Sequence, residues 1–274
     1  MKFFLAPMQG LTGYIVRNAF HHHFDYIDKY YTPFIPAAKR MNAKIKRDIA
    51  PVNNDGITLI PQAMSIVADE VIDLHRQLVP YGYDEINVNL GCPSGTVVSK
   101  KRGSGILAYP DMLDSFLDEL YTKADFPVSI KTRVGFNDDE LWPKLIEIYS
   151  KYPISELTVH PRVQKDFYKN TPRLDDFALA IQKINPDKTI LCYNGDITDT
   201  NSFNALTDRF PDIDEIMIGR GLFANPALIA ELKGISMDKA ELCERLKNWH
   251  DEILSGYLSI FSGVSATPSI IPST

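Results

Sequence analysis

Residues 85–93 read EINVNLGCP, a short β-rich run that ends in glycine, cysteine and proline. Similar runs recur at roughly 30-residue intervals, separated by amphipathic stretches of helix length, which is the pattern of repeated strand–helix units. We predict eight strands, at residues 3–8, 26–34, 58–64, 85–91, 127–134, 156–161, 189–194 and 215–219.

Helices are expected in most of the connections, at residues 14–22, 69–81, 111–123, 139–152, 175–184 and 199–210. The connection at residues 36–55 has a poor helical signal and a basic composition, so we expect a loop with a short helix at most. Eight such units with near-continuous apolar strands favour an α/β fold of the closed (β/α)8 TIM barrel type over an open doubly wound sheet. No GxGxxG motif follows the first strand, so the sequence does not support a dinucleotide-binding fold.

The sequence predicts two parts, a barrel at residues 1–234 and a C-terminal segment at residues 235–274. In the second part, residues 238–258 have a helical pattern. Residues 259–274, SIFSGVSATPSIIPST, are rich in Ser, Pro and Thr, and we expect them to be unstructured.

The composition indicates a soluble, cytoplasmic protein. No apolar run is long enough to span a membrane, and the N-terminal residues MKFFLAPMQG lack the features of a secretory signal. The formal net charge of −6 argues against a protein coated in basic surface, although a local basic patch remains compatible with it.

The three cysteines lie far apart in the sequence, so neither a disulfide framework nor a CxxC metal knuckle is indicated. Cys192 falls in an apolar run and Cys243 in a helical pattern, and packing explains both. The run of histidines at residues 21–23 does not predict a metal site, because adjacent helical residues point in different directions and no partner has ligand spacing.

Polar or unusual residues stand at the ends of most predicted strands. In a (β/α)8 barrel the active site is assembled at the C-terminal ends of the strands, and a barrel filled only for stability would not need such residues there. The set comprises Gln9, Gln62, Asn89, Cys92, Lys131, Arg133, His160, Arg162, Asn194, Asp196 and Arg220.

The last two strand ends are rich in glycine. Gly195, Gly219 and Gly221 would expose backbone N–H groups to a phosphate, and Arg220 would add a positive charge. Glycines of strand–helix turns have the same appearance, but an arginine between two of them favours a phosphate site.

Six motifs in a fixed order, over residues 3 to about 230, resemble the dihydrouridine synthase family. They are APMQG (6–10), NVNLGCPS (87–94), SIKTRVGF (129–136), TVHPR (158–162), NGDI (194–197) and MIGRGLFANP (217–226). The resemblance implies reduction of uridine to 5,6-dihydrouridine in tRNA by an FMN enzyme that is recharged by NADPH or NADH. It also implies that FMN is held by Pro7, Met8, Gln9, Gln62, Lys131, His160, Asn194, Gly195, Asp196, Gly219 and Arg220.

The same resemblance assigns Cys92 as the catalytic acid. Reduction of the uracil C5=C6 bond needs a hydride at C6, which flavin N5 supplies, and a proton at C5. A thiol is mostly protonated at neutral pH and so can provide that proton. A lone cysteine is more often a buried apolar residue, but here Asn-Leu-Gly precedes it and Pro-Ser follows it.

Binding of tRNA is the remaining implication. Lys131, His160 and Arg162 are candidates to stabilise charge on the uracil carbonyl. Basic runs are usually plain solvated surface, but beside the resemblance they predict contacts to the RNA backbone. The substrate-side set comprises Lys39, Arg40, Asn89, Lys100, Lys101, Arg102, Arg133, Arg162 and Tyr168.

The chain departs from the family pattern in two places. Pro161 stands where the family usually has glycine, so we expect a changed loop after the sixth strand. After the barrel only a short, incomplete helical segment is expected in place of the family's compact helical domain. We therefore keep two alternatives open: an FMN enzyme that acts on a free pyrimidine, and a catalytically impaired flavin- or RNA-binding form. A monomer is expected in each case.

Overall fold

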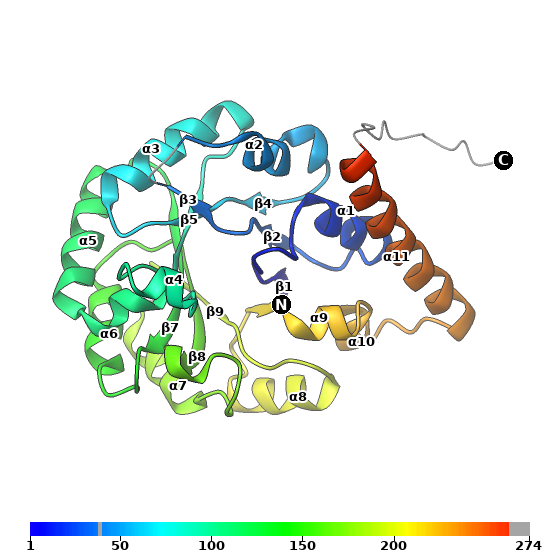
Figure 1. Cartoon of the computed structure of the whole chain (residues 1–274). Helices are drawn as coiled ribbons and strands as arrows, with labels where there is room; N and C mark the ends of the chain where they lie inside the picture. The colour runs from blue at the N-terminus through cyan, green and yellow to red at the C-terminus, as the bar shows by residue number, and fades with distance from the viewer. Residues whose placement is uncertain (38–39, 263–274) are drawn as a thin grey trace.

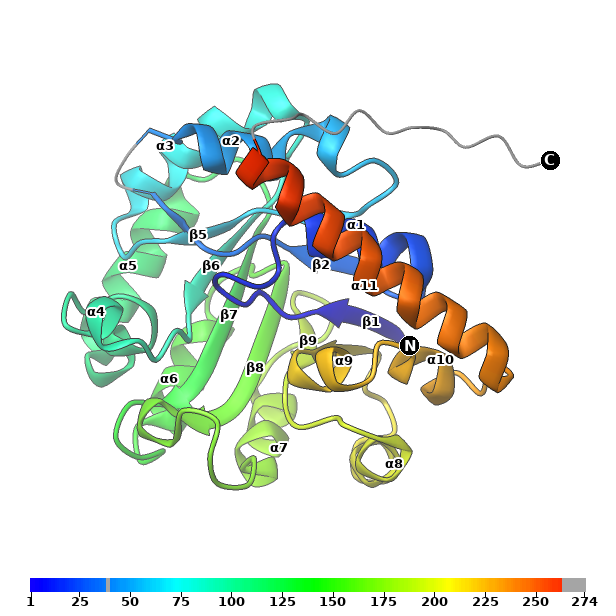
Figure 2. The same ribbon diagram turned by 45° about the vertical axis from the view of Figure 1, so that its right-hand side comes forward.

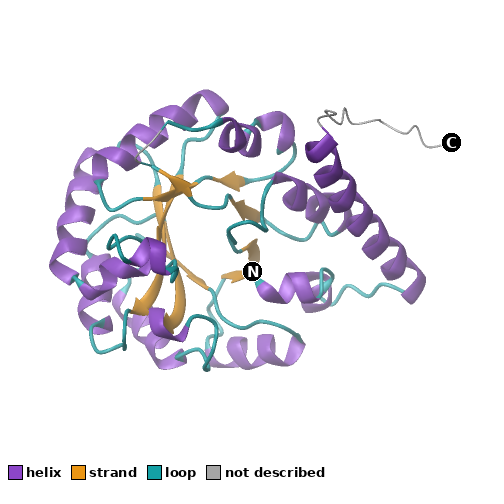
Figure 3. Ribbon diagram, in the orientation of Figure 1, coloured by secondary structure: helices purple, strands orange, loops and turns teal. Residues whose placement is uncertain are grey.

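The computed structural model describes residues 1–37 and 40–262. In this part of the chain one sheet of ten parallel strands curls into a barrel, and helices cover its outside (Figures 1 and 3). The strands are β1 (Lys2–Leu5), β2 (Lys29–Tyr31), β3 (Ile35–Pro36), β4 (Leu59–Ile60), β5 (Gln62–Met64), β6 (Ile86–Leu90), β7 (Val128–Gly135), β8 (Glu156–Val163), β9 (Ile190–Tyr193) and β10 (Glu215–Ile218).

The ten strands correspond to the eight predicted ones with two additions. The predicted strand at residues 58–64 is divided into β4 and β5, and β3 lies just beyond the predicted strand at residues 26–34, which contains β2. Strand β4 continues into β5 across Pro61, which has no N–H to donate to a ladder. On the neighbouring segment β2 pairs with β4, and β3 pairs with β5. The pairings of β1 with β2 and of β5 with β6 continue the sheet on both sides. The predicted (β/α)8 barrel is therefore confirmed.

The predicted helices are present, with ends displaced by a few residues. They are α1 (Tyr14–His23), α3 (Ala68–Leu78), α5 (Pro110–Lys123), α6 (Trp142–Ser150), α7 (Leu174–Lys183) and α8 (Thr200–Arg209). Short elements that the sequence pattern did not predict follow β6 and β10, namely α4 (Gly95–Val98), α9 (Arg220–Ala224) and α10 (Leu228–Leu232). None of the helices in the described residues is long and apolar enough to cross a membrane.

The connection at residues 36–55 contains α2 (Ala43–Ile49), the short helix that the sequence allowed at most. Asn42 caps it, since its side-chain oxygen accepts a hydrogen bond from Ile45 N at 3.0 Å. Lys39 lies outside the described residues.

The expected end of the sixth predicted strand at Pro161 is wrong. Strand β8 continues through Pro161 to Val163, and its register against β7 shifts between Arg133 and Gly135. The Pro161 carbonyl accepts a hydrogen bond from Arg173 N at 2.7 Å. The missing N–H is therefore accommodated by a local irregularity of the ladder rather than by an early loop.

After the barrel, α11 (Lys239–Ser262) packs across α1 (Figure 2). The rings of Trp249 and Phe20 lie 5.3 Å apart, and His22 and His23 both contact the Glu252 carboxylate at 2.9 Å. Two of the histidines therefore fasten α11 to the barrel.

Two expectations about this C-terminal part are wrong. The helix includes residues 259–262, which we expected to be unstructured, and residues 263–274 lie outside the described part. Cys243 is exposed on α11, so packing does not explain it, whereas Cys192 is fully buried as expected.

Candidate active site

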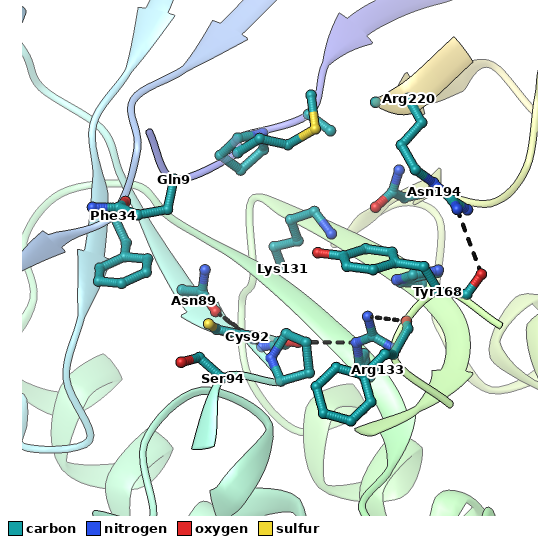
Figure 4. A pocket seen from close by; sticks show the side chains of 18 of the residues that line it. Gln9, Phe34, Asn89, Cys92, Ser94, Lys131, Arg133, Tyr168, Asn194 and Arg220 are labelled. Atoms are coloured by element: carbon teal, nitrogen blue, oxygen red, sulfur yellow. Dashed lines mark hydrogen bonds between the residues drawn. The ribbon is translucent and has the colours of Figure 1, made fainter. Parts of the chain in front are cut away.

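A cavity of about 540 Å³ opens at the C-terminal ends of the strands (Figure 4), which is within the usual size range of small-molecule sites. Cys92 and all the residues predicted to hold the cofactor line it, together with Asn89, Arg133 and Tyr168 from the substrate-side set. The barrel thus brings together side chains from seven predicted strand ends.

Cys92 follows β6 and is held by its backbone. Asn89 Oδ1 accepts hydrogen bonds from Gly91 N at 3.1 Å and from Cys92 N at 2.9 Å, while Ser104 N and Oγ donate to the Cys92 carbonyl at 3.1 and 2.8 Å. The thiol points into the cavity beside Asn89 and Ser94 (Figure 4).

The Cys92 thiol stays protonated at neutral pH. Burial raises its pKa, and the opposing effects of the Ser94 N–H and of the Arg133 and Lys131 charges do not outweigh that burial. A thiol with a raised pKa is a poor nucleophile but a suitable proton donor.

A chain of hydrogen-bonded side-chain amides inside the barrel holds Asn89, and through it the Cys92 loop, in place. Gln62 Nε2 donates to Asn87 Oδ1 at 2.8 Å, and Asn89 Nδ2 donates to Gln62 Oε1 at 2.8 Å. Asn87 Nδ2 completes the chain by donating to Ser129 Oγ at 3.0 Å. Because Asn89 is committed to Gln62 and to the Cys92 loop, it positions the cysteine as well as lining the cavity.

Lys131, in the middle of β7, has no charge partner. Its Nζ forms no hydrogen bond or ion pair with another described residue, and it projects into the cavity between Cys92 and Tyr168 (Figure 4). Burial and the nearby Arg133 charge lower its pKa to about 7. Because nothing in the described protein neutralises this ammonium, the cavity favours a ligand with hydrogen-bond acceptors or negative charge.

His160, near the end of β8, lines one wall of the cavity, and Arg162 lies buried behind it. Arg162 Nη1 donates to His160 Nε2 at 3.2 Å and to Asp196 Oδ1 at 2.9 Å, while Nε and Nη2 donate to the Asn170 carbonyl. Since Nε2 accepts, the His160 ring carries its proton on Nδ1. Burial, together with the surrounding arginine and lysine charges, lowers the His160 pKa well below its usual range, so the ring is neutral.

Arg162 is therefore not placed as expected. It is fully buried, it does not line the cavity, and all three of its nitrogens donate to protein acceptors. This leaves no free donor for RNA or for the uracil carbonyl. Its structural effect is to orient His160 and Asp196.

Arg133 also links separate backbone segments of the site by hydrogen bonds. It is buried, and it donates to the carbonyls of Gly91 at 3.0 Å, Val163 at 2.9 Å and Phe167 at 2.7 Å. Tyr168 lies outside it and is exposed, with the guanidinium groups of Arg133 and Arg220 at 5.5 and 5.1 Å from its ring centroid.

The loops after β9 and β10 form the end of the cavity that was predicted to bind phosphate. Arg220 Nη2 contacts Asp196 Oδ1 at 2.7 Å. Burial raises the Asp196 pKa, but the hydrogen bond and charge of Arg162 and the charge of Arg220 outweigh it and lower the value below its usual range. A Cβ at Gly195 would lie 2.0 Å from Tyr193 Oη, so any side chain there would displace the Tyr193 ring.

The structure does not bring the rest of the substrate-side set into the cavity. Arg102 Nη2 pairs with Glu70 Oε2 at 3.1 Å, and Lys101 Nζ lies over the Tyr109 ring at 4.3 Å. Lys100 and Arg40 are exposed outside the cavity lining. In the described residues no cluster of His, Cys, Asp or Glu has the arrangement of a metal site.

Three lining residues, Leu11, Phe34 and Phe167, lie outside both the predicted site residues and the quoted motifs. Phe34 closed a predicted strand, so its place at a strand end was a usable signal. Leu11 and Phe167 lie in loops without a periodic pattern, and only the tertiary structure places them in the cavity.

Comparison with known proteins identifies a family and several relatives of this chain. The sequence model of the dihydrouridine synthase family matches residues 4–254. A probable tRNA-dihydrouridine synthase of Staphylococcus aureus is 28% identical over 231 residues, which cover 82% of this chain and 69% of that protein. The tRNA-dihydrouridine synthase B of Pasteurella multocida is 27% identical over 243 residues, covering 85% of this chain and 69% of that protein.

Solved structures with the same fold include a variant of NCR from Zymomonas mobilis and morphinone reductase, each with a TM-score of 0.58 and 11% identity. These similarities cover 90% and 88% of both chains, respectively, and concern the fold alone. The family model, in contrast, matches the barrel and most of α11 at the level of sequence. The chain belongs to the dihydrouridine synthase family.

Proposed function

We propose that this protein reduces a uridine of tRNA to 5,6-dihydrouridine with a flavin mononucleotide, and that Cys92 donates the proton to C5. The observation that carries the proposal is a single cavity lined by the Cys92 thiol, which follows β6, and by Lys131 on the neighbouring strand β7, whose Nζ has no partner among the described residues. Family membership and the names of the relatives support the same substrate and reaction.

The residues of the cavity fit a flavin mononucleotide. A phosphate would find Arg220 and the Gly195 and Gly219 backbones at one end. The ring system, which carries several acceptors, would find the Lys131 ammonium and the side chains of Gln9 and Gln62. When bound, the flavin supplies the hydride that C6 of the uracil receives.

The chain's own residues then supply the proton and the orientation. Asn89 holds the Cys92 backbone, so the thiol is presented at a defined place, and its raised pKa keeps the proton available at neutral pH. His160 contributes Nδ1–H, whose direction is set by the hydrogen bond from Arg162 to Nε2. A neutral imidazole in this position donates a hydrogen bond without placing another positive charge beside Lys131.

The test uses purified protein, tRNA that lacks dihydrouridine, and either NADPH or NADH. We expect the protein to carry flavin, recognisable from the absorbance and mass of the released cofactor, and to form dihydrouridine at one position, read by mass spectrometry of digested tRNA. Reduction of orotate or free uridine with untouched tRNA would contradict the proposal in favour of a free-pyrimidine enzyme. A flavin-loaded protein that never modifies tRNA would also contradict it.

The finer expectations belong to the same proposal. We infer that the reductant is NADPH or NADH, and that the protein acts in the cytoplasm as a monomer without a metal. Size-exclusion chromatography with light scattering measures the oligomeric state, and metal analysis of the active protein measures the metal content.

A further inference from the structure

A second cavity of about 340 Å³ adjoins the first and shares Gln9 and Phe34 with it. It lies between the loop after β1, helix α2 and the last turns of α11. The proposed reaction at Cys92 gives this second cavity no role.

The second cavity is positively charged. Lys44 and Arg47 line it, and the side chain of neither forms a hydrogen bond or ion pair with another described residue. The one carboxylate in its lining, Asp48, accepts hydrogen bonds from Tyr14 N at 2.7 Å and from the buried Arg17 at 3.2 Å. Since Asp48 is neutralised by Arg17, the two remaining cations favour an anionic ligand.

Aromatic side chains form much of the remaining lining. Tyr14 comes from the start of α1, Tyr257 from α11 and Phe34 from the segment between β2 and β3. All three are partly buried and line the cavity, and Tyr257 also packs against the hydrophobic core. Aromatic rings beside cations are the combination that binds unstacked nucleobases together with their phosphates.

Basic residues continue beyond the cavity. Arg40 and Lys46 are exposed, and their side chains also have no partner among the described residues. A single small anion would need only Lys44 and Arg47, whereas a polynucleotide backbone uses a series of cations. This observation favours RNA over a free dinucleotide.

We propose that the second cavity binds a nucleotide next to the reduced uridine in the same RNA strand. Its phosphate contacts Lys44 and Arg47, and its base packs against Tyr14 and Tyr257. Because the two cavities share the wall formed by Gln9 and Phe34, adjacent nucleotides of one RNA strand can occupy them together. The nucleotide in the second cavity then holds the strand while the uracil reaches Cys92. The identity of the RNA as a tRNA substrate rests on the proposed function.

The test compares Lys44→Ala/Arg47→Ala with a control, Lys183→Ala/Lys188→Ala, which removes the same charge near the C-terminal end of α7. For the cavity variant we expect the Kd and the KM for tRNA to rise about tenfold or more, and the slope of log Kd against log salt to fall by about two. Flavin content and the rate of flavin reduction by the nicotinamide cofactor without tRNA should stay as in the wild type. The control should keep the wild-type Kd.

A second pair of variants tests the base contact. Tyr257→Ala should weaken tRNA binding about tenfold, in line with the usual effect of losing one base–aromatic stack, whereas Tyr257→Phe should bind as the wild type does. Circular dichroism and thermal melting would verify that each variant is folded.

The outcomes separate the two proposals. An unchanged tRNA Kd and salt slope in Lys44→Ala/Arg47→Ala would overturn the inference even if the wild type forms dihydrouridine. Slower flavin reduction with an unchanged Kd would overturn it in favour of a site for the nicotinamide cofactor. A wild type that forms no dihydrouridine but binds tRNA through Lys44 and Arg47 would refute the proposed function and leave the binding inference supported.

Discussion

The barrel encloses two lysine–cysteine clusters, and they differ in one respect. In the upper cluster, Lys131 and Cys92 border the cavity at the C-terminal ends of the strands, and Lys131 has no partner within residues 1–37 and 40–262. In the lower cluster, Lys29 and Cys192 lie toward the opposite end of the barrel, and Lys29 Nζ pairs with Glu156 Oε2 at 2.7 Å.

The lower cluster is satisfied internally. Glu156 Oε1 also accepts hydrogen bonds from Tyr31 Oη and from Thr158 Oγ1, both at 2.7 Å. Burial lowers the Lys29 pKa, but the Glu156 carboxylate outweighs it and raises the value. Cys192 is fully buried, and burial raises its pKa well above the usual range, so it remains an inert thiol.

The difference shows what makes a buried lysine and cysteine functional. The same residue types stabilise the fold where a carboxylate balances the cation, and they prepare a binding site where that carboxylate is missing. In the ligand-free protein, the buried and unpaired charge of Lys131 lowers the stability of the fold. A bound ligand with acceptors or negative charge would offset this loss.

The largest expected effect separates the two cysteines. Cys92→Ala should reduce dihydrouridine formation by about 10²- to 10⁴-fold, because a positioned general acid is lost, while flavin content stays unchanged. Mass spectrometry of tRNA after timed incubation measures the rate. Cys192→Ala is the control and should keep wild-type turnover; equal turnover in both variants would remove Cys92 from the mechanism.

The next effect concerns stability in the lower cluster. Glu156→Gln keeps the size of the side chain but removes the charge that balances Lys29, so the free energy of unfolding should fall by about 3 kcal/mol. Urea denaturation followed by circular dichroism measures the change. If stability were unaffected, the ion pair would not explain why the lower cluster is closed.

In flavin-free protein, Lys131→Met should raise the free energy of unfolding, whereas Glu156→Gln should lower it. The folded pKa of Lys131 is about 7, below its ordinary value of 10.5, so the unfolded chain binds more protons between these pH values. The wild type is therefore penalised increasingly as the pH falls from about 10 to about 7.

We expect the variant to exceed the wild type by about 2 kcal/mol at pH 7, with the advantage disappearing near pH 10. Denaturation curves of both proteins at several pH values measure the difference. The same variant should bind flavin more weakly. A destabilised Lys131→Met at pH 7 would mean that the ammonium is already balanced within the protein.

The smallest effect is the pH dependence of turnover. Because burial raises the Cys92 pKa above its usual value of 9.0, the proton-bearing form persists through neutral pH. With saturating tRNA and reduced flavin, the rate of the proton-dependent step should be flat from pH 7 to pH 8, because both lie below the usual thiol value of 9.0. It should then fall about tenfold per pH unit above the pKa. A decline centred on neutral pH would point to another acid.

Much of the architecture follows from local sequence patterns. The apolar strand runs and the intervening amphipathic stretches predicted eight strands and a barrel. The rule that active sites form at strand ends selected Gln62, Cys92 and Lys131 from the sequence alone. The interruption at Pro61 and the continuation of β8 past Pro161 were not predictable in detail, because each depends on the neighbouring strand to which the chain pairs.

The sequence by itself determined the fold class and the set of polar residues that meet at one end of the barrel, since both follow from periodicity and from the parallel direction of the strands. Only the tertiary structure decided which of these residues keep free donors. Each guanidinium nitrogen of Arg162 and of Arg133 donates to a carbonyl or a side chain brought close by folding, whereas Lys131 Nζ has no partner among the described residues. The second cavity is also tertiary in origin, because its walls come from residues 9–48 and from the end of α11. Hydrogen-bond partners are set by proximity in space, which a local pattern does not encode.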